Sequence, residues 1–95
     1  MIPTLIWEHN GQTLILTGEF DRDTLPAFWQ QRNQLLKGIN AINFSQLSHI
    51  DSTGLAMFVR LKSEQQSENK LLVFEGISER FKTLIRLYKL EDFMN

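Results

Sequence analysis

The stretch Ile50-Asp51-Ser52-Thr53-Gly54-Leu55 marks the point at which an extended segment of this chain gives way to a helix. Before it, asparagines alternate with apolar residues over residues 39–44, which predicts a β-strand, and residues 45–49 form a polar stretch that we expect to be a loop. After it, a helix is expected from Ser52 to about Gln66. This stretch therefore predicts a strand, loop and helix unit typical of an α/β fold.

Upstream, two short runs rich in β-branched and aromatic residues, at residues 4–7 and 13–17, are separated by His9-Asn10-Gly11-Gln12. The Asn-Gly pair supplies the positive φ angles of a tight turn, so these runs predict a β-hairpin. Asp23 or Thr24 is a suitable cap for a following helix, which we expect to run to about Lys37 before Gly38 ends it.

Downstream, residues 71–75 are almost purely apolar, which predicts a fourth strand that is central and buried on both faces. A last helix is expected near Ser78, because apolar side chains recur at i, i+3, i+4 and i+7 from Phe81. The element order is then ββαβαβα. Because crossover connections are right-handed, this order predicts an α/β domain over residues 1–95, with helices packed on a mixed, mostly parallel four-stranded sheet.

Composition excludes several classes of protein. The chain has 95 residues, of which 42% are hydrophobic and 22% charged, with a net charge of -1, so it is too apolar for a disordered chain and has no basic stripe for nucleic acid. It contains no cysteine and therefore neither a disulfide framework nor a thiolate zinc site. No run of about 18 apolar residues is present, so we expect no direct membrane insertion.

The sequence offers little to hold a metal or to act as an acid pair. His9 and His49 each lack a second histidine or a cysteine at ligand spacing, so we expect no metal site and interpret both as solvated loop residues. Glu19 and Asp21 follow Gly18 at the end of a predicted strand, where such residues usually form turns. We therefore assign no acid–base catalysis to them.

Nucleophilic and phosphate-binding motifs are also missing. His49, Asp51 and Ser52 contain the residue types of a hydrolytic triad, but neighbours in sequence seldom take up the positions of nucleophile, base and orienting acid. No Gly-x-Ser-x-Gly elbow surrounds Ser52, and the sequence contains neither of the common glycine-rich phosphate-binding loops. The chain is therefore expected to have no enzymatic activity, no catalytic residues and no cofactor.

What remains is the hydroxyl of Ser52 at a helix start. The simplest interpretation is that Ser52 is the N-cap, which stabilises a helix by about 1 kcal/mol. A phosphate on Ser52 would also be tolerated there, because the positive end of the helix dipole favours negative charge, and it would add about -1.5 to -2 charges. Ser52 is therefore a candidate phosphorylation site as well as a cap.

The helix after Ser52 carries more apolar residues than one sheet-facing stripe needs. If Leu55 and its helical neighbours face the sheet, Met57 and Leu61 fall on the flank or the outer side. Either these two side chains pack against a neighbouring helix, or they form a hydrophobic patch for a partner beside Ser52. Trp29 is interpreted as a core residue and left out of the site, because a large ring gains most from burial.

Two motifs in this order resemble the STAS domains of anti-sigma factor antagonists and sulfate transporter tails. They are Gly18-Glu19-Phe20-Asp21 after the second predicted strand and Asp51-Ser52-Thr53-Gly54-Leu55 at the helix start. The likeness spans nearly the whole chain. Within the family it is strongest to the small cytoplasmic STAS subunits of the ABC transporters that maintain outer-membrane lipid asymmetry.

The resemblance implies a partner-binding function. A chain of the transporter type would be a non-catalytic subunit that binds the transporter's ATPase subunit and, through it, the membrane permease, in the cytoplasm at the inner membrane. The partner-binding residues would be Asp51, Ser52, Thr53 and Gly54 with Met57 and Leu61. The alternative that the family implies is an anti-sigma factor antagonist phosphorylated on Ser52, and a small-ligand or lipid-binding module is a third possibility.

Overall fold

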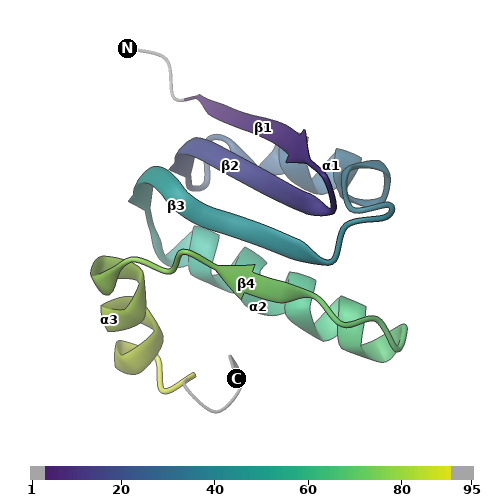
Figure 1. The fold of residues 1–95 in the computed structure, drawn as a ribbon. Helices are drawn as coiled ribbons and strands as arrows, with labels where there is room; N and C mark the ends of the chain where they lie inside the picture. The colour runs from purple at the N-terminus through teal and green to yellow at the C-terminus, as the bar shows by residue number, and fades with distance from the viewer. Residues whose placement is uncertain (1–3, 91–95) are drawn as a thin grey trace.

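A computed structural model describes residues 4–90 of the chain. Seven elements follow one another in the order ββαβαβα (Figure 1). They are β1 (Leu5–Asn10), β2 (Thr13–Phe20), α1 (Leu25–Leu35), β3 (Ala41–Ile50), α2 (Ser52–Ser67), β4 (Val73–Glu75) and α3 (Glu79–Leu87).

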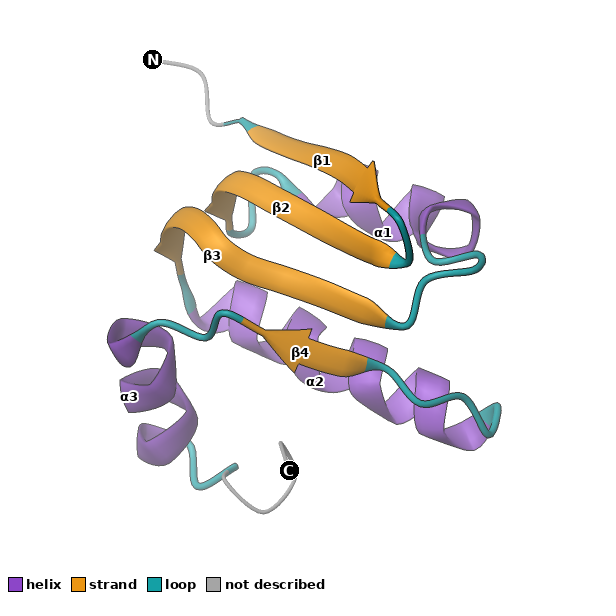
Figure 2. Ribbon diagram, viewed as in Figure 1, coloured by secondary structure: helices purple, strands orange, loops and turns teal. Residues whose placement is uncertain are grey.

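The four strands form one mixed sheet in the order β1-β2-β3-β4. The β1–β2 hairpin is antiparallel and turns at Gly11, whose φ is 62°, whereas β2 pairs with β3, and β3 with β4, in parallel. Helices α1 and α2 cover one face of the sheet, and α3 lies beyond β4 next to the first turns of α2 (Figures 1 and 2). Among residues 4–90, no helix covers the opposite face (Figure 2).

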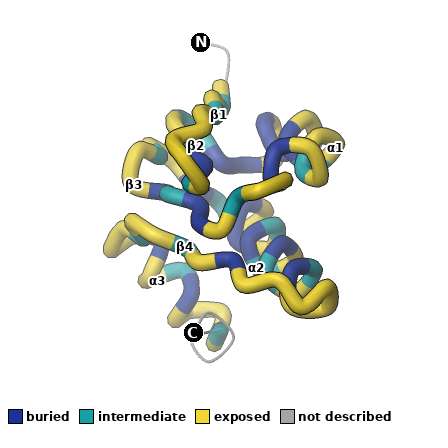
Figure 3. Tube along the Cα trace, turned by 45° about the vertical axis from the view of Figure 1, so that its right-hand side comes forward, coloured by how far each residue is buried: buried dark blue, intermediate teal, exposed yellow. Residues whose placement is uncertain are grey.

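The core lies between the sheet and the helices, where one aromatic ring from each of the seven elements joins a continuous chain of ring contacts. Neighbouring centroids in this chain are 4.1 to 6.0 Å apart. The aromatic chain consists of Trp7, Phe28, Phe20, Phe44, Phe58, Phe74 and Phe81. Figure 3 shows the buried positions concentrated along the inner sides of the elements. Most of these rings are fully buried, as expected for the strongest apolar contribution to a small core.

Two predictions about the strands are wrong. The polar residues 45–49 do not form a loop, because β3 continues through them to Ile50 and pairs with the end of β2 across two register shifts. Residues 71–75 do not form a central strand either. β4 is a short edge strand over Val73–Glu75, with Leu71 82% and Val73 45% exposed. Only Leu72 and Phe74 of this apolar run face the core.

The parallel register of β2 and β3 positions the start of α2. Phe20 and Ile50, the last residues of the two strands, are direct neighbours in the sheet. The loops that follow them, which lead to α1 and α2, therefore lie side by side at the carboxyl edge. That edge is where open α/β sheets usually carry their sites.

Candidate functional site

Asp51 caps α2 and joins it to the loop after β2. Its backbone is extended, and its Oδ1 accepts a hydrogen bond of 2.8 Å from the Gly54 N–H. Its Oδ2 accepts a weaker bond of 3.4 Å from the Arg22 N–H. The prediction that Ser52 is the N-cap is therefore wrong. Aspartate takes that position because its carboxylate satisfies an otherwise unpaired amide and also carries the charge that a helix N-terminus favours.

The loop after β2 is held by its own hydrogen bonds. Asp21 is buried, and its Oδ1 accepts a hydrogen bond of 3.0 Å from the Asp23 N–H, while the Thr24 hydroxyl donates to the Glu19 carbonyl over 2.8 Å. His49, at the end of β3, places its Nε2 3.9 Å from Asp21 Oδ2. Asp21 therefore acts as the turn former that the sequence indicates.

No catalytic triad is assembled at this edge. The charged neighbour of His49 is Asp21 rather than Asp51, and within residues 4–90 no hydrogen bond joins His49 to Ser52. In the same described part of the chain, no three histidine, aspartate or glutamate side chains are grouped so as to hold a metal ion. Both histidines lie in strands rather than in loops, and His9 Nε2 is 3.0 Å from the Leu35 carbonyl oxygen.

Ser52 and Thr53 are the exposed residues of the motif. They form the first turn of α2, and neither hydroxyl has a hydrogen-bond partner among the described residues. Both are thus available to a partner. Gly54 differs, because it is buried and a Cβ at this position would overlap the carbonyl oxygen of Phe20 and lie 2.9 Å from Ile50 Cγ1. Its structural role is to let the helix start pack closely against the end of β2.

The two apolar candidates, Met57 and Leu61, differ in burial. Leu61 has no exposed surface and belongs to the core, so of its two alternatives the packed one holds and Leu61 is not part of an exposed partner patch. The buried side of α2 runs through Leu55, Phe58, Leu61 and Gln65, and is therefore wider than a stripe drawn from Leu55 and its nearest helical neighbours. Met57 is half-buried, packs against the core cluster and keeps part of its surface beside the first turn.

A cluster of one tryptophan and two arginine side chains, which is not predicted from the sequence, lies beside α2. Trp29 of α1 is half-buried, with the Arg32 guanidinium carbon 3.6 Å and that of Arg60 4.9 Å from its ring centroid. Arg32 also forms a salt bridge of 3.1 Å to Glu64. The available signal was the spacing of Arg60, which lies seven residues after Thr53 and so on the same face of α2.

A family model described as "Mlab, STAS domain" matches residues 4–95. The chain belongs to the STAS domain family. It is similar to the intermembrane phospholipid transport system binding protein MlaB of Escherichia coli, with 34% identity over 90 residues that cover 95% of this chain and 93% of that protein. It is also 33% identical to the anti-sigma-B factor antagonist of Listeria monocytogenes over 85 residues, covering 85% of this chain and 74% of that protein.

The fold of this STAS domain has a solved counterpart. The anti-sigma factor antagonist SpoIIAA in its unphosphorylated form superposes with a TM-score of 0.58 at 19% sequence identity, covering 88% of this chain and 83% of that one. The predicted α/β class, with three helices and a mixed four-stranded sheet, is confirmed, as is the resemblance to STAS domains. Within residues 4–90, no helix of this STAS domain is long and apolar enough to span a bilayer.

Proposed function

We propose that this STAS domain is a non-catalytic accessory subunit of a phospholipid ABC transport complex that maintains outer-membrane lipid asymmetry. It binds the ATPase subunit through the start of α2 and, through that subunit, joins the membrane permease. The observation that carries this proposal is the exposed pair Ser52 and Thr53, whose hydroxyls have no partner among residues 4–90. Its likeness to MlaB, named as a binding protein of a phospholipid transport system, supports the choice of partner.

The proposed docking surface follows the outer face of α2. Ser52, Thr53, Ala56 and Arg60 are exposed and fall on one side of the helix, and half-buried Met57 borders them. This surface combines a small apolar area with hydroxyl donors. At the end away from Ser52, the Arg60 guanidinium stacks on the Trp29 ring. Arginine and tryptophan are enriched among residues that contribute most to binding. Asp51 and Gly54 support the surface by fixing the helix start rather than by touching the partner.

In this proposal the protein catalyses no reaction, and it needs no cofactor, metal or nucleic acid. Docking stabilises the folded ATPase by mass action, since any partner that binds only the native state shifts the folding equilibrium toward it. The subunit is cytoplasmic and lies at the inner membrane only through the complex. Fractionation with and without the permease tests this placement, because loss of the permease should release the protein from the membrane fraction.

The alternative function is that of an anti-sigma factor antagonist that switches partners when Ser52 is phosphorylated. The Listeria relative favours it, and so does the position of Ser52 in the first turn of α2, where the helix dipole tolerates a phosphate. A phosphate would place about -1.5 to -2 charges at the Ser52 end of the docking surface and should therefore weaken binding there. A lipid-binding module remains the third candidate, for which lipid co-purifying with the isolated domain is the readout.

The discriminating experiment is affinity purification of the tagged protein from its native cell, followed by binding measurements with the recovered partner. Recovery of an ATPase together with a permease supports the proposal. Ser52→Asp and Thr53→Asp should weaken ATPase binding at least tenfold, which is about 1.4 kcal/mol. The control is Thr83→Asp, because Thr83 is exposed on α3 and lies outside the docking surface.

Two results would contradict the proposal. Recovery of a serine kinase that releases the protein on phosphorylating Ser52, without an ATPase, establishes the antagonist instead. Equal loss of ATPase binding in Ser52→Asp and Thr83→Asp would show that the start of α2 has no special role. All variants should first keep the thermal unfolding midpoint of the unmodified protein, since these side chains are exposed.

A further inference from the structure

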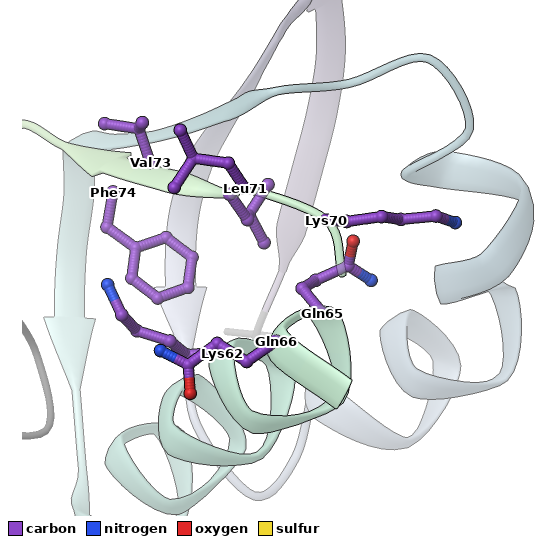
Figure 4. A pocket seen from close by; sticks show the side chains of 8 residues that line it. Lys62, Gln65, Gln66, Lys70, Leu71, Val73 and Phe74 are labelled. Atoms are coloured by element: carbon purple, nitrogen blue, oxygen red, sulfur yellow. The ribbon is translucent and has the colours of Figure 1, made fainter. Parts of the chain in front are cut away.

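Arg60 is the basic residue that α2 presents on its outer face. It follows Thr53 by two helical turns, which is about 10 Å along the helix axis. Lys62, the other basic residue of this helix, lies roughly 160° around it from Arg60. Together with Gln66, Lys62 lines a groove of about 290 Å³ between α2 and β4 (Figure 4). Within α2, Arg60 is therefore the one cationic side chain on the proposed docking surface.

The Arg60 guanidinium has no acceptor within residues 4–90. No hydrogen bond or ion pair joins it to that part of the chain. Its guanidinium carbon lies over the Trp29 ring instead, 4.9 Å from the ring centroid. Arginine carries five N–H donors in one plane, and stacking on a ring leaves the donors at the edge of that plane free. The stack therefore holds the guanidinium without using its donors.

The carboxylate of this cluster is already paired. Glu64 lies one turn after Arg60, but its oxygens bind Arg32 of α1, whose Nε is 3.1 Å from Oε1 and whose Nη2 is 3.3 Å from Oε2. Arg32 also donates through Nη1 to the Trp29 carbonyl oxygen over 2.8 Å, and its guanidinium carbon is 3.6 Å from the centroid of the Trp29 ring. Arg32 and Glu64 thus neutralise each other, which leaves one uncompensated positive charge on Arg60.

The surface around this charge suits contact with a protein. Between Thr53 and Arg60 the sequence contains no other ionisable side chain, and exposed Ala56 and half-buried Met57 separate the two residues on the outer face. Covering an unpaired guanidinium with a partner would cost free energy of desolvation unless the partner supplies an acceptor. A planar carboxylate suits it best, because it accepts two parallel hydrogen bonds from arginine.

We propose that Arg60 binds an aspartate or glutamate side chain of the ATPase subunit and that Trp29 positions Arg60 for this contact. The inference rests on the proposed function, since it names the chemistry of the partner at the same docking surface. The carboxylate accepts two hydrogen bonds from Arg60, while the Thr53 hydroxyl binds a second group of the same partner. Two polar contacts about 10 Å apart then fix how the ATPase lies along α2. Arg32, held by Glu64, stabilises the position of the Trp29 ring.

The test measures the affinity of the full chain for the recovered ATPase as Arg60 is varied. Arg60→Glu should weaken binding at least about tenfold, because it opposes two carboxylates. Arg60→Lys keeps the charge but loses the planar fork, so it should weaken binding severalfold. Arg60→Gln should also make the affinity less sensitive to salt. All Arg60 variants should keep the thermal unfolding midpoint, since this side chain is exposed.

Two control variants should bind like the unmodified protein. Arg86→Glu makes the same charge reversal on α3, where Arg86 is exposed outside the docking surface. Gln66→Glu adds a negative charge to α2 itself, but on the side that faces the groove in Figure 4. The two controls separate a local contact of Arg60 from an effect of net charge.

A charge exchange identifies the partner group. Surface aspartates and glutamates of the ATPase are replaced by arginine one at a time, and one of these changes should restore the binding of Arg60→Glu at least about tenfold. Trp29→Leu tests the positioning role: it should weaken binding severalfold beside Arg60 and have no further effect beside Arg60→Gln. Trp29→Phe, which keeps an aromatic ring, should bind more tightly than Trp29→Leu, with thermal melts to show that both are folded.

Three results would overturn the inference and leave the proposed function intact. They are full affinity in Arg60→Glu while Ser52→Asp binds weakly, equal losses in Arg60→Glu and the two controls, and no arginine substitution of the ATPase that restores binding. Unchanged affinity in both Ser52→Asp and Arg60→Glu would instead overturn the docking surface itself, and the inference with it.

Discussion

Gly54→Ala should destabilise the protein even though alanine is the better helix former. In an exposed helix interior this substitution stabilises by about 1 kcal/mol. At Gly54, however, the new Cβ would overlap the Phe20 carbonyl oxygen and lie 3.0 Å from its ring carbon Cδ2. Overpacking of a core costs about 1–3 kcal/mol, and the upper end applies because a backbone atom of β2 cannot rotate away. The expected net loss is about 2 kcal/mol.

Urea unfolding followed by circular dichroism measures this loss directly. For a domain of this size, about 2 kcal/mol corresponds to roughly 8–16 °C in the thermal midpoint. The m-value should stay constant, because the surface exposed on unfolding barely changes. Ser63→Ala is the matched control, since Ser63 is exposed on the same helix and should change the free energy of unfolding by no more than about 0.5 kcal/mol. A Gly54→Ala variant as stable as the unmodified protein would refute the close packing of the helix start.

Asp51→Ala should lower the free energy of unfolding by about 1 kcal/mol through loss of the cap, while Asp51→Asn should retain most of it, as compared by urea denaturation. Leu61→Ala should lower the free energy of unfolding by roughly 2–5 kcal/mol, and Met57→Ala should lower it clearly less. Equal losses measured by the same method would place both side chains in the core. A double-mutant cycle on Arg32 and Glu64 should give a coupling of roughly 0.5–1 kcal/mol that shrinks in 1 M salt, and a coupling insensitive to salt would argue against an ion pair.

The sequence was sufficient for the element order because its turn and cap residues act locally. Asn10-Gly11 sets the hairpin, and Ser78 accepts a hydrogen bond from the Phe81 N–H at the start of α3, as the helical spacing from Phe81 indicates. The family motif likewise located the start of α2. In each case a few neighbouring residues determine the backbone conformation, so no knowledge of distant contacts is needed.

The wrong predictions concern features that depend on contacts between residues far apart in the sequence. β3 continues through polar residues 45–49 because β2 supplies backbone partners there, which the composition of a segment does not reveal. Leu61 is core because the buried side of α2 continues through it from Phe58 to Gln65, which the apolar residues at the start of the helix do not reveal by themselves. Asp51 and Ser52 are both good caps, so only the hydrogen bond to Gly54 decided between them.

The aromatic chain bears on how the molecule unfolds. It runs from Trp7 in the first strand to Phe81 in the last helix, and Phe44 contacts four other rings within it. If one element separates from the core, the rings of the neighbouring elements therefore lose packing contacts and become exposed. The hairpin and α3, although far apart in sequence, should lose protection from hydrogen exchange at nearly the same free energy. Tryptophan fluorescence, to which Trp7 of β1 and Trp29 of α1 both contribute, then reports the loss of the whole structure rather than fraying of one edge.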